Sequence, residues 1–145
     1  MQTFLPFADF RHSAEVLDSK RLGKQIIEAR QIYRTLNRTT GGWRNHPAVR
    51  MWRGHQPALV MYTERMNNEW HDRYGRDHRA FINLIDIDVN GQVRADSIVG
   101  VVMPEWLGDD RLHGSHRAAL LAKKPEHYEQ FGWVDEAKLD YWWPV

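Results

Sequence analysis

The sequence predicts a mainly α-helical fold in one compact domain, and three observations lead to that prediction. Apolar residues recur at steps of three and four along several stretches, which is the spacing of one face of a helix. Gly-Gly and proline signals separate these stretches, as expected at helix ends and starts. The 145 residues contain no repeat, low-complexity run or linker composition, so a single domain is expected over 1–145.

The first long helix is expected to start near Asp9 or Ser13, which are both plausible N-caps, and to run to about Asn37. Gly41–Gly42 then stops it. The apolar stripe of this helix consists of Leu22, Ile26, Ala29, Tyr33 and Leu36.

Two prolines mark the next helices. Pro47 suits the first position of a new helix, and Pro57 opens a second one that ends at Gly75. The buried face of that second helix is marked by Leu59, Tyr62, Met66 and Trp70. Residues 77–87 are also expected to be helical, and the Asn-Gly pair that follows them allows a short β-hairpin near 87–94.

The C-terminal third begins with the loop "MPEWLGDD". Ser115 is expected to cap a helix through Lys123, and Pro125 to start a last short helix. The tail "YWWPV" should fold back onto the body, because three adjacent aromatic side chains are costly to leave in water. The chain thus has three longer helices with irregular connections.

Composition excludes several classes of protein. Cysteine is absent, which removes disulfides and cysteine–metal sites and suits the cytoplasm. There is no apolar run long enough for a membrane span and no secretion signal at the start. None of the eight histidines has the spacing of a zinc-binding helix, so no metal or cofactor is expected. The net charge is only +1, but residues 1–60 are strongly basic, which makes that half a candidate surface for an anionic partner.

The first long helix also carries a polar face with candidate catalytic residues. Arg21, Lys24 and Glu28 recur at steps of three and four opposite the apolar stripe. A solvated face with weak ion pairs is one interpretation. The other is a general acid or base, because Ile27 and Ile32 are expected to flank Glu28 and to desolvate its carboxylate in part.

Residues 42–55 interleave cations with aromatics: Arg44, His46 and Arg53 stand among Trp43 and Trp52. Such a mixture suits phosphate contacts with base stacking. An ordinary connection between helices with buried tryptophans remains the alternative.

Residues 114–128 provide a third candidate. Ser115, His116 and Arg117 are expected at a helix N-terminus, which is a natural anion site. The alternative is that they form only a helix cap and its neighbours.

In their order and spacing these stretches resemble the pyrimidine-dimer DNA glycosylase family, also called endonuclease V, of phage and bacteria. The resemblance rests on "VLDSKRLGKQIIEARQIY", "HPAVRMWRGHQPALVMY" and "MPEWLGDD" followed by "SHRAALLAKKPEHYEQFGW". It implies a compact helical monomer that binds duplex DNA, bends it and flips out a base. Such an enzyme cleaves the glycosidic bond and then nicks the strand by β-elimination, without a cofactor.

The resemblance also implies the catalytic groups. The nucleophile is the N-terminal α-amine, which is substantially neutral near pH 7–8 when its pKa is about 7.7–8.0. In the phage enzyme a threonine presents that amine after the methionine is removed. Here Gln2 normally prevents removal, so the amine belongs to Met1. Glu28 matches the family glutamate by its position on the helix, and Ile27 stands where the phage enzyme has an arginine.

The expected function is therefore excision of damaged bases, including pyrimidine dimers, from duplex DNA. The expected DNA-contacting residues are Arg21, Lys24, Arg44, His46, Arg53, His116 and Arg117. Two alternatives remain open: a non-catalytic DNA-binding module of the same fold, and a nucleoside-processing enzyme that uses the same pocket.

Overall fold

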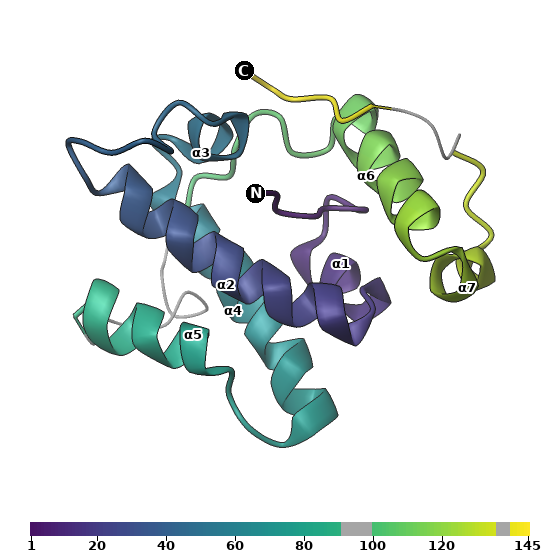
Figure 1. The fold of residues 1–145 in the computed structure, drawn as a ribbon, viewed down its shortest axis with the longest axis horizontal. Coiled ribbons are helices and arrows are strands. Elements are labelled where there is room, and N and C mark those ends of the chain that lie inside the picture. Colours follow the sequence, from purple (N-terminus) through teal and green to yellow (C-terminus); the bar gives the residue numbers. More distant parts are fainter. Residues whose placement is uncertain (91–99, 136–139) are drawn as a thin grey trace.

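The computed structural model describes residues 1–90, 100–135 and 140–145, and within these ranges it contains helices and irregular segments but no strand. The mainly α prediction is confirmed. The three longer helices are α2 (Ser19–Leu36), α4 (Gln56–Tyr74) and α6 (Asp110–Lys123). Figure 1 shows α2 lying across α4, with α6 to one side and the N-terminal segment between them.

The expected first helix is in fact two helices, α1 (Phe10–Val16) and α2. Asp9 caps α1, since its carboxylate accepts a hydrogen bond from the His12 amide at 2.8 Å. The prediction of Ser13 as an N-cap is wrong. Ser13 lies inside α1, where its hydroxyl donates to the Phe7 carbonyl at 2.9 Å and fixes the chain that enters the helix.

The break between α1 and α2 is held from the far end of the chain. Leu17 and Asp18 are extended, and the Asp18 amide donates to the Tyr128 hydroxyl at 3.1 Å. That hydroxyl donates in turn to the Asp18 carboxylate. Because the partner is 110 residues away, the local apolar spacing could not reveal this break.

The proline and glycine signals between residues 47 and 75 are confirmed. Pro47 is the first residue of α3 (Pro47–Trp52), and Pro57 lies in the first turn of α4. Gly75 ends α4 at a φ of 73°, a left-handed conformation that glycine adopts without strain.

The helical segment after α4 consists of α5 (Arg79–Asn83) and a π-helical turn, Leu84–Asp88. The helical prediction for 77–87 is therefore confirmed in its main part. Residues 91–94, half of the hairpin expected near 87–94, lie outside the described part of the chain, and its first two residues belong to the π-helical turn.

Helix α6 begins earlier than expected. Asp109 is its N-cap and accepts a hydrogen bond from the Arg111 amide at 3.0 Å. The prediction that Ser115 caps this helix is wrong, because Ser115 is buried in the helix interior and donates to the Leu112 carbonyl at 2.9 Å. Gly114 lies within α6 at a close approach: a Cβ there would stand 3.2 Å from an Asp135 carboxylate oxygen.

The last elements follow the prediction. Pro125 starts α7 (Pro125–Tyr128), which a 3₁₀ turn, Glu129–Phe131, extends. The tail residues Tyr141, Trp142 and Trp143 are partly buried against the core, as expected. No helix in the described part of the chain is long and apolar enough to span a membrane.

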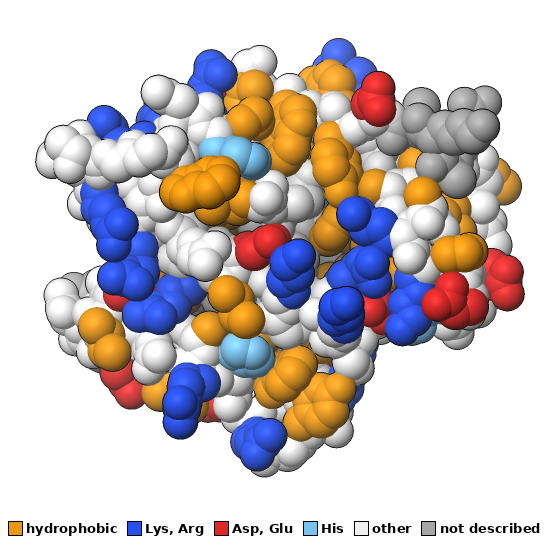
Figure 2. Space-filling view, in the orientation of Figure 1, with side chains coloured by type: hydrophobic (Ala, Val, Ile, Leu, Met, Phe, Trp, Pro, Cys, Tyr) orange, Lys and Arg blue, Asp and Glu red, His pale blue; other side chains and the backbone are white. Residues whose placement is uncertain are grey.

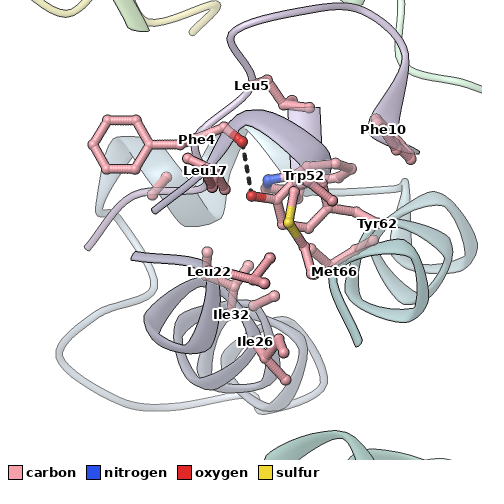
Figure 3. Close-up of a cluster of buried hydrophobic side chains, with 14 of the residues drawn as sticks. Phe4, Leu5, Phe10, Leu17, Leu22, Ile26, Ile32, Trp52, Tyr62 and Met66 are labelled. Carbon is pink, nitrogen blue, oxygen red and sulfur yellow. Dashed lines mark hydrogen bonds between the residues drawn. The ribbon is translucent and has the colours of Figure 1, made fainter. Parts of the chain in front are cut away.

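The core lies between α2, α4 and the N-terminal segment. Figure 3 shows side chains of the two long helices, among them Leu22, Ile26, Tyr62 and Met66, meeting Phe4 and other residues of that segment. The apolar stripe of α2 is the one that the sequence indicated, with Ile32 added to it.

Candidate active site

The N-terminal segment is extended and buried, although it pairs with no strand. Residues 2–6 are all buried, so their backbone amides and carbonyls need partners inside the protein. Side chains from several helices supply them. The Phe4 amide donates to the Gln25 side-chain oxygen at 2.7 Å, and the Tyr62 hydroxyl donates to the Phe4 carbonyl at 2.9 Å (Figure 3).

Helix α6 holds the next two residues of this segment. The Leu5 amide donates to His116 Nδ1 at 2.9 Å, and His113 Nδ1 lies 2.8 Å from the Leu5 carbonyl. Arg117 donates to the Pro6 carbonyl at 2.8 Å. These three contacts, from residues close together on α6, therefore fix the position of the chain start relative to that helix.

Glu28 lies where this segment begins. The Gln2 amide donates to Glu28 Oε2 at 3.1 Å, and the Lys24 ammonium lies 4.0 Å from Glu28 Oε1. The Glu28 side chain is only 14% exposed. The start of the chain, rather than a row of isoleucines, therefore covers one side of the carboxylate.

The expected apolar flank of Glu28 is wrong for Ile32, whereas Ile27 lies on the exposed side as expected. Ile32 belongs to the core and is fully buried, whereas Ile27 is 43% exposed. The helix rotates the two residues onto different faces because they are five positions apart. The expected partial burial of Glu28 is nevertheless present, and Gln2 is its cause.

An open pocket of about 370 Å³ joins Glu28 to the first residue of the chain. Its lining consists of Met1, Glu28, Gln31, Arg34, Thr35, Arg38 and Trp43. Figure 2 shows that Lys and Arg side chains gather on this face of the molecule, over α2. The pocket therefore combines the first residue of the chain, a carboxylate, an exposed indole and a basic rim.

His46 responds electrostatically to both candidate catalytic groups. Burial lowers the pKa of His46 below its ordinary value, the positive chain terminus lowers that pKa further, and Glu28 acts in the opposite direction. His46 Nδ1 accepts a hydrogen bond from the Ala48 amide at 3.0 Å, which suits a neutral imidazole. The charges of the chain terminus and of Glu28 therefore both act on His46.

The C-terminal tail reaches the same region. Burial raises the pKa of the Tyr141 hydroxyl, Glu28 raises it further, and Arg21 opposes the change. The Tyr141 ring also contacts Phe4 and His116 edge-on. The sequence indicated that this tail folds back, but no local signal showed that it closes over the N-terminal segment.

The expected DNA-contacting residues separate into groups. Lys24 and His46 lie at the Glu28 site, while Arg21 forms an ion pair with the buried Asp18 at 3.3 Å. Arg44 and Arg53 are exposed on the segment that carries Trp43, and Arg53 donates to the Arg44 carbonyl at 2.7 Å.

The expectation for residues 115–117 is wrong in its placement, because they lie inside α6 rather than at a helix N-terminus. His116 is fully buried, and burial followed by the charge of His113 lowers its pKa to about 3. In this position it anchors Leu5 and does not reach a DNA surface. Arg117 is held by Asp135 at 2.7 Å and by the Pro6 carbonyl.

Sequence reasoning missed the anchoring residues Gln25, Tyr62 and His113. Gln25 carried a signal, since a glutamine on the buried side of an amphipathic helix requires a polar partner. Tyr62 had been assigned to the core for its ring alone. In the described ranges, no cluster of three or more His, Asp or Glu side chains is arranged to hold a metal ion.

Comparison with protein-family models matches residues 1–83 to the model of the pyrimidine dimer DNA glycosylase. Searches of curated proteins and of solved structures found no match. The matched region covers more than half of the 145 residues and contains every residue that lines the Glu28 pocket. The chain therefore belongs to the pyrimidine dimer DNA glycosylase family.

Proposed function

We propose that this member of a DNA repair glycosylase family excises pyrimidine dimers from duplex DNA and then nicks the strand, using the α-amine of Met1 and the carboxylate of Glu28. The observation that carries the proposal is the 3.1 Å hydrogen bond from the Gln2 amide to Glu28. It brings the first residue of the chain and a carboxylate into one open pocket. The family match supports the glycosylase activity.

The chemistry begins with attack of the neutral amine on C1′ of the damaged nucleotide. The new N–C1′ bond forms as the glycosidic bond breaks, and the base leaves with that electron pair and takes up a proton. The bound nitrogen then loses a proton, and the sugar ring opens as the C1′–O4′ bond breaks and the ring oxygen takes up a proton. The product is a protonated imine between Met1 and the sugar.

Glu28 then acts as the general base. Its carboxylate takes the C2′ proton, and the C3′–O3′ bond breaks as the 3′ phosphate leaves. Water hydrolyses the imine and frees the amine. Before these steps the same carboxylate stabilises the positive charge that develops on the sugar.

The basic rim of the pocket binds the phosphates of the duplex. Lys24 is 64% exposed, and Arg34 and Arg38 line the pocket itself. Arg44 and Arg53 extend this surface along the segment that carries Trp43. Phosphate contacts of this kind give an affinity that falls steeply with salt. All the groups named come from one chain, so a monomer suffices.

Borohydride trapping tests the proposal, because the reagent reduces an imine to a stable amine bond. We expect a covalent protein–DNA adduct with a duplex that contains one pyrimidine dimer and with a duplex that contains one abasic site. Peptide mapping of the adduct should locate the DNA on Met1.

Two outcomes would contradict the proposal. Binding of both duplexes without any adduct would identify a non-catalytic DNA-binding module. An adduct mapped to Lys24, whose ammonium lies 4.0 Å from Glu28, would assign the nucleophile to a side chain. The matched control is Glu15→Gln, which removes an exposed carboxylate of α1 and should leave trapping unchanged.

A further inference from the structure

Trp43 is unusual among the tryptophans because its side chain is left largely in water. It is 60% exposed, whereas Trp52 on the following helix is fully buried. An indole has a large apolar surface that folding normally covers. Here the exposed ring lines the pocket that contains Met1 and Glu28.

The segment that carries Trp43 is held by local hydrogen bonds rather than by burial. The His46 amide donates to the Trp43 carbonyl at 3.0 Å, and Arg44 donates to the Thr39 carbonyl at 2.7 Å. Arg53 reaches back from beyond α3 to the Arg44 carbonyl at 2.7 Å. The backbone of Trp43 is therefore fixed before any ligand arrives, which reduces the entropy cost of binding.

The composition of the pocket indicates the class of ligand. One wall is an indole, the rim carries Arg34 and Arg38, and the volume of about 370 Å³ lies within the range of small-molecule sites. An aromatic wall beside cations suits a planar base that is still attached to its phosphates. The amine and carboxylate side of the pocket would then face the sugar of the same nucleotide.

We infer that, when the base to be excised is turned out of the DNA stack, the Trp43 ring stacks on it. The inference rests on the proposed function and adds a specificity residue to it. Trp43 contacts only the base, so it assists the excision step, whereas Met1 and Glu28 act on the sugar. Once the base has gone, the strand-nicking step no longer depends on Trp43.

Two substrates separate these steps. A duplex with a pyrimidine dimer requires excision, while a duplex with an abasic site has no base to stack and requires only nicking. For Trp43→Ala, single-turnover excision from the dimer duplex should fall on the order of 5- to 150-fold, the value of one stacking contact. Nicking of the abasic duplex should stay within about twofold of the wild type. Trp43→Phe, which keeps a stacking face, should recover most of the lost rate.

The matched control is Tyr74→Ala, which removes another exposed aromatic side chain at the end of α4, outside the pocket. It should change neither rate. An equal loss on both duplexes for Trp43→Ala would overturn the inference, because the residue would then act on the sugar or on folding. No loss on either duplex would overturn it as well.

A second measurement does not need turnover. In the Glu28→Gln background, equilibrium binding should favour the dimer duplex over the abasic duplex, and adding Trp43→Ala should reduce that preference by the same factor. An unchanged preference would overturn the inference. Failure of the proposed function is distinct, since it is detected as a wild-type protein that nicks neither duplex.

Discussion

Two pockets invite comparison as candidate sites, and the larger one is the less promising. It has a volume of about 540 Å³ and lies where α4 ends and α5 begins. Its lining includes Trp70, which packs against α2 at Gly23, together with Arg76, His78 and Arg79. The Glu28 pocket is smaller, at about 370 Å³. Volume alone would therefore not select the Glu28 pocket.

The two pockets differ in how their polar groups are held. In the larger pocket the contacts are local and build the turn between two helices: His78 caps α5, and Asn67 bonds to the His78 amide at 2.7 Å and to Asp77 at 3.1 Å. In the Glu28 pocket the contacts join distant parts of the chain. The contacts between distant segments bring the start of the chain to Glu28, whereas the local contacts serve only to build the turn between α4 and α5.

The change expected to separate the pockets most is Glu28→Gln. Loss of a general base lowers a rate by about 10²- to 10⁴-fold, so nicking of an abasic duplex should fall by that factor while DNA binding is retained. Asn83→Ala in the larger pocket should change nicking by less than about twofold. Single-turnover kinetics with both variants measures the difference, and normal nicking by Glu28→Gln would contradict the assigned role.

The anchors of the two pockets provide the next comparison. Gln25→Leu leaves the buried Phe4 amide without its acceptor, and Asn67→Leu does the same to the His78 amide. Each should lower the free energy of unfolding by about 1–3 kcal/mol, measured by urea denaturation. Only Gln25→Leu should also slow nicking, by up to about 100-fold, because a small displacement of the amine misaligns it.

Both anchor variants are assayed at a temperature where each is fully folded. An equal loss of activity in the two would show that stability, rather than the position of the chain start, determines the rate. Tyr62→Phe offers a milder check, since it removes the hydroxyl that donates to the Phe4 carbonyl and keeps the ring in the core.

Basic residues at the two pockets should contribute unequally to DNA binding. Lys24→Gln with Arg38→Gln removes two cations at the Glu28 pocket, so the slope of log affinity against log salt should become shallower by about 1.8, at about 0.9 per phosphate contact. Arg76→Gln with Arg79→Gln makes the same change in charge at the larger pocket and should leave the slope nearly unaltered. Equal effects would show that the DNA contacts both pockets.

The comparison also explains what the sequence could predict. The helices, their proline starts and the Gly75 stop follow from local patterns, and so does the amphipathic face that presents Glu28. The break at Asp18 and the burial of His116 depend on partners more than 100 residues away, which no spacing rule detects. Glu28 could thus be selected from its helix and from the family resemblance, but the anchors that bring the chain start to it could not.

Acidification provides the last comparison, because it perturbs the anchors without removing them. Burial lowers the pKa of His116 to about 3, against an ordinary value near 6.5, so the folded protein holds this ring neutral. The unfolded chain binds the proton first, and stability should therefore fall as the pH drops from about 6.5 toward 3, by at most ~1.4 kcal/mol per pH unit for this one group. Burial likewise lowers the pKa of His78 at the larger pocket.

The variants His116→Gln and His78→Gln each remove one titrating ring. Urea denaturation measures the drop in the free energy of unfolding between pH 7 and pH 5. His116→Gln should reduce this drop more than His78→Gln does, since His116 is the more deeply buried of the two. If both variants lose as much stability between pH 7 and pH 5 as the wild type does, other groups, such as the buried His113, control this loss. The hydrogen bond between His116 and the Leu5 amide would then not determine how stability depends on pH.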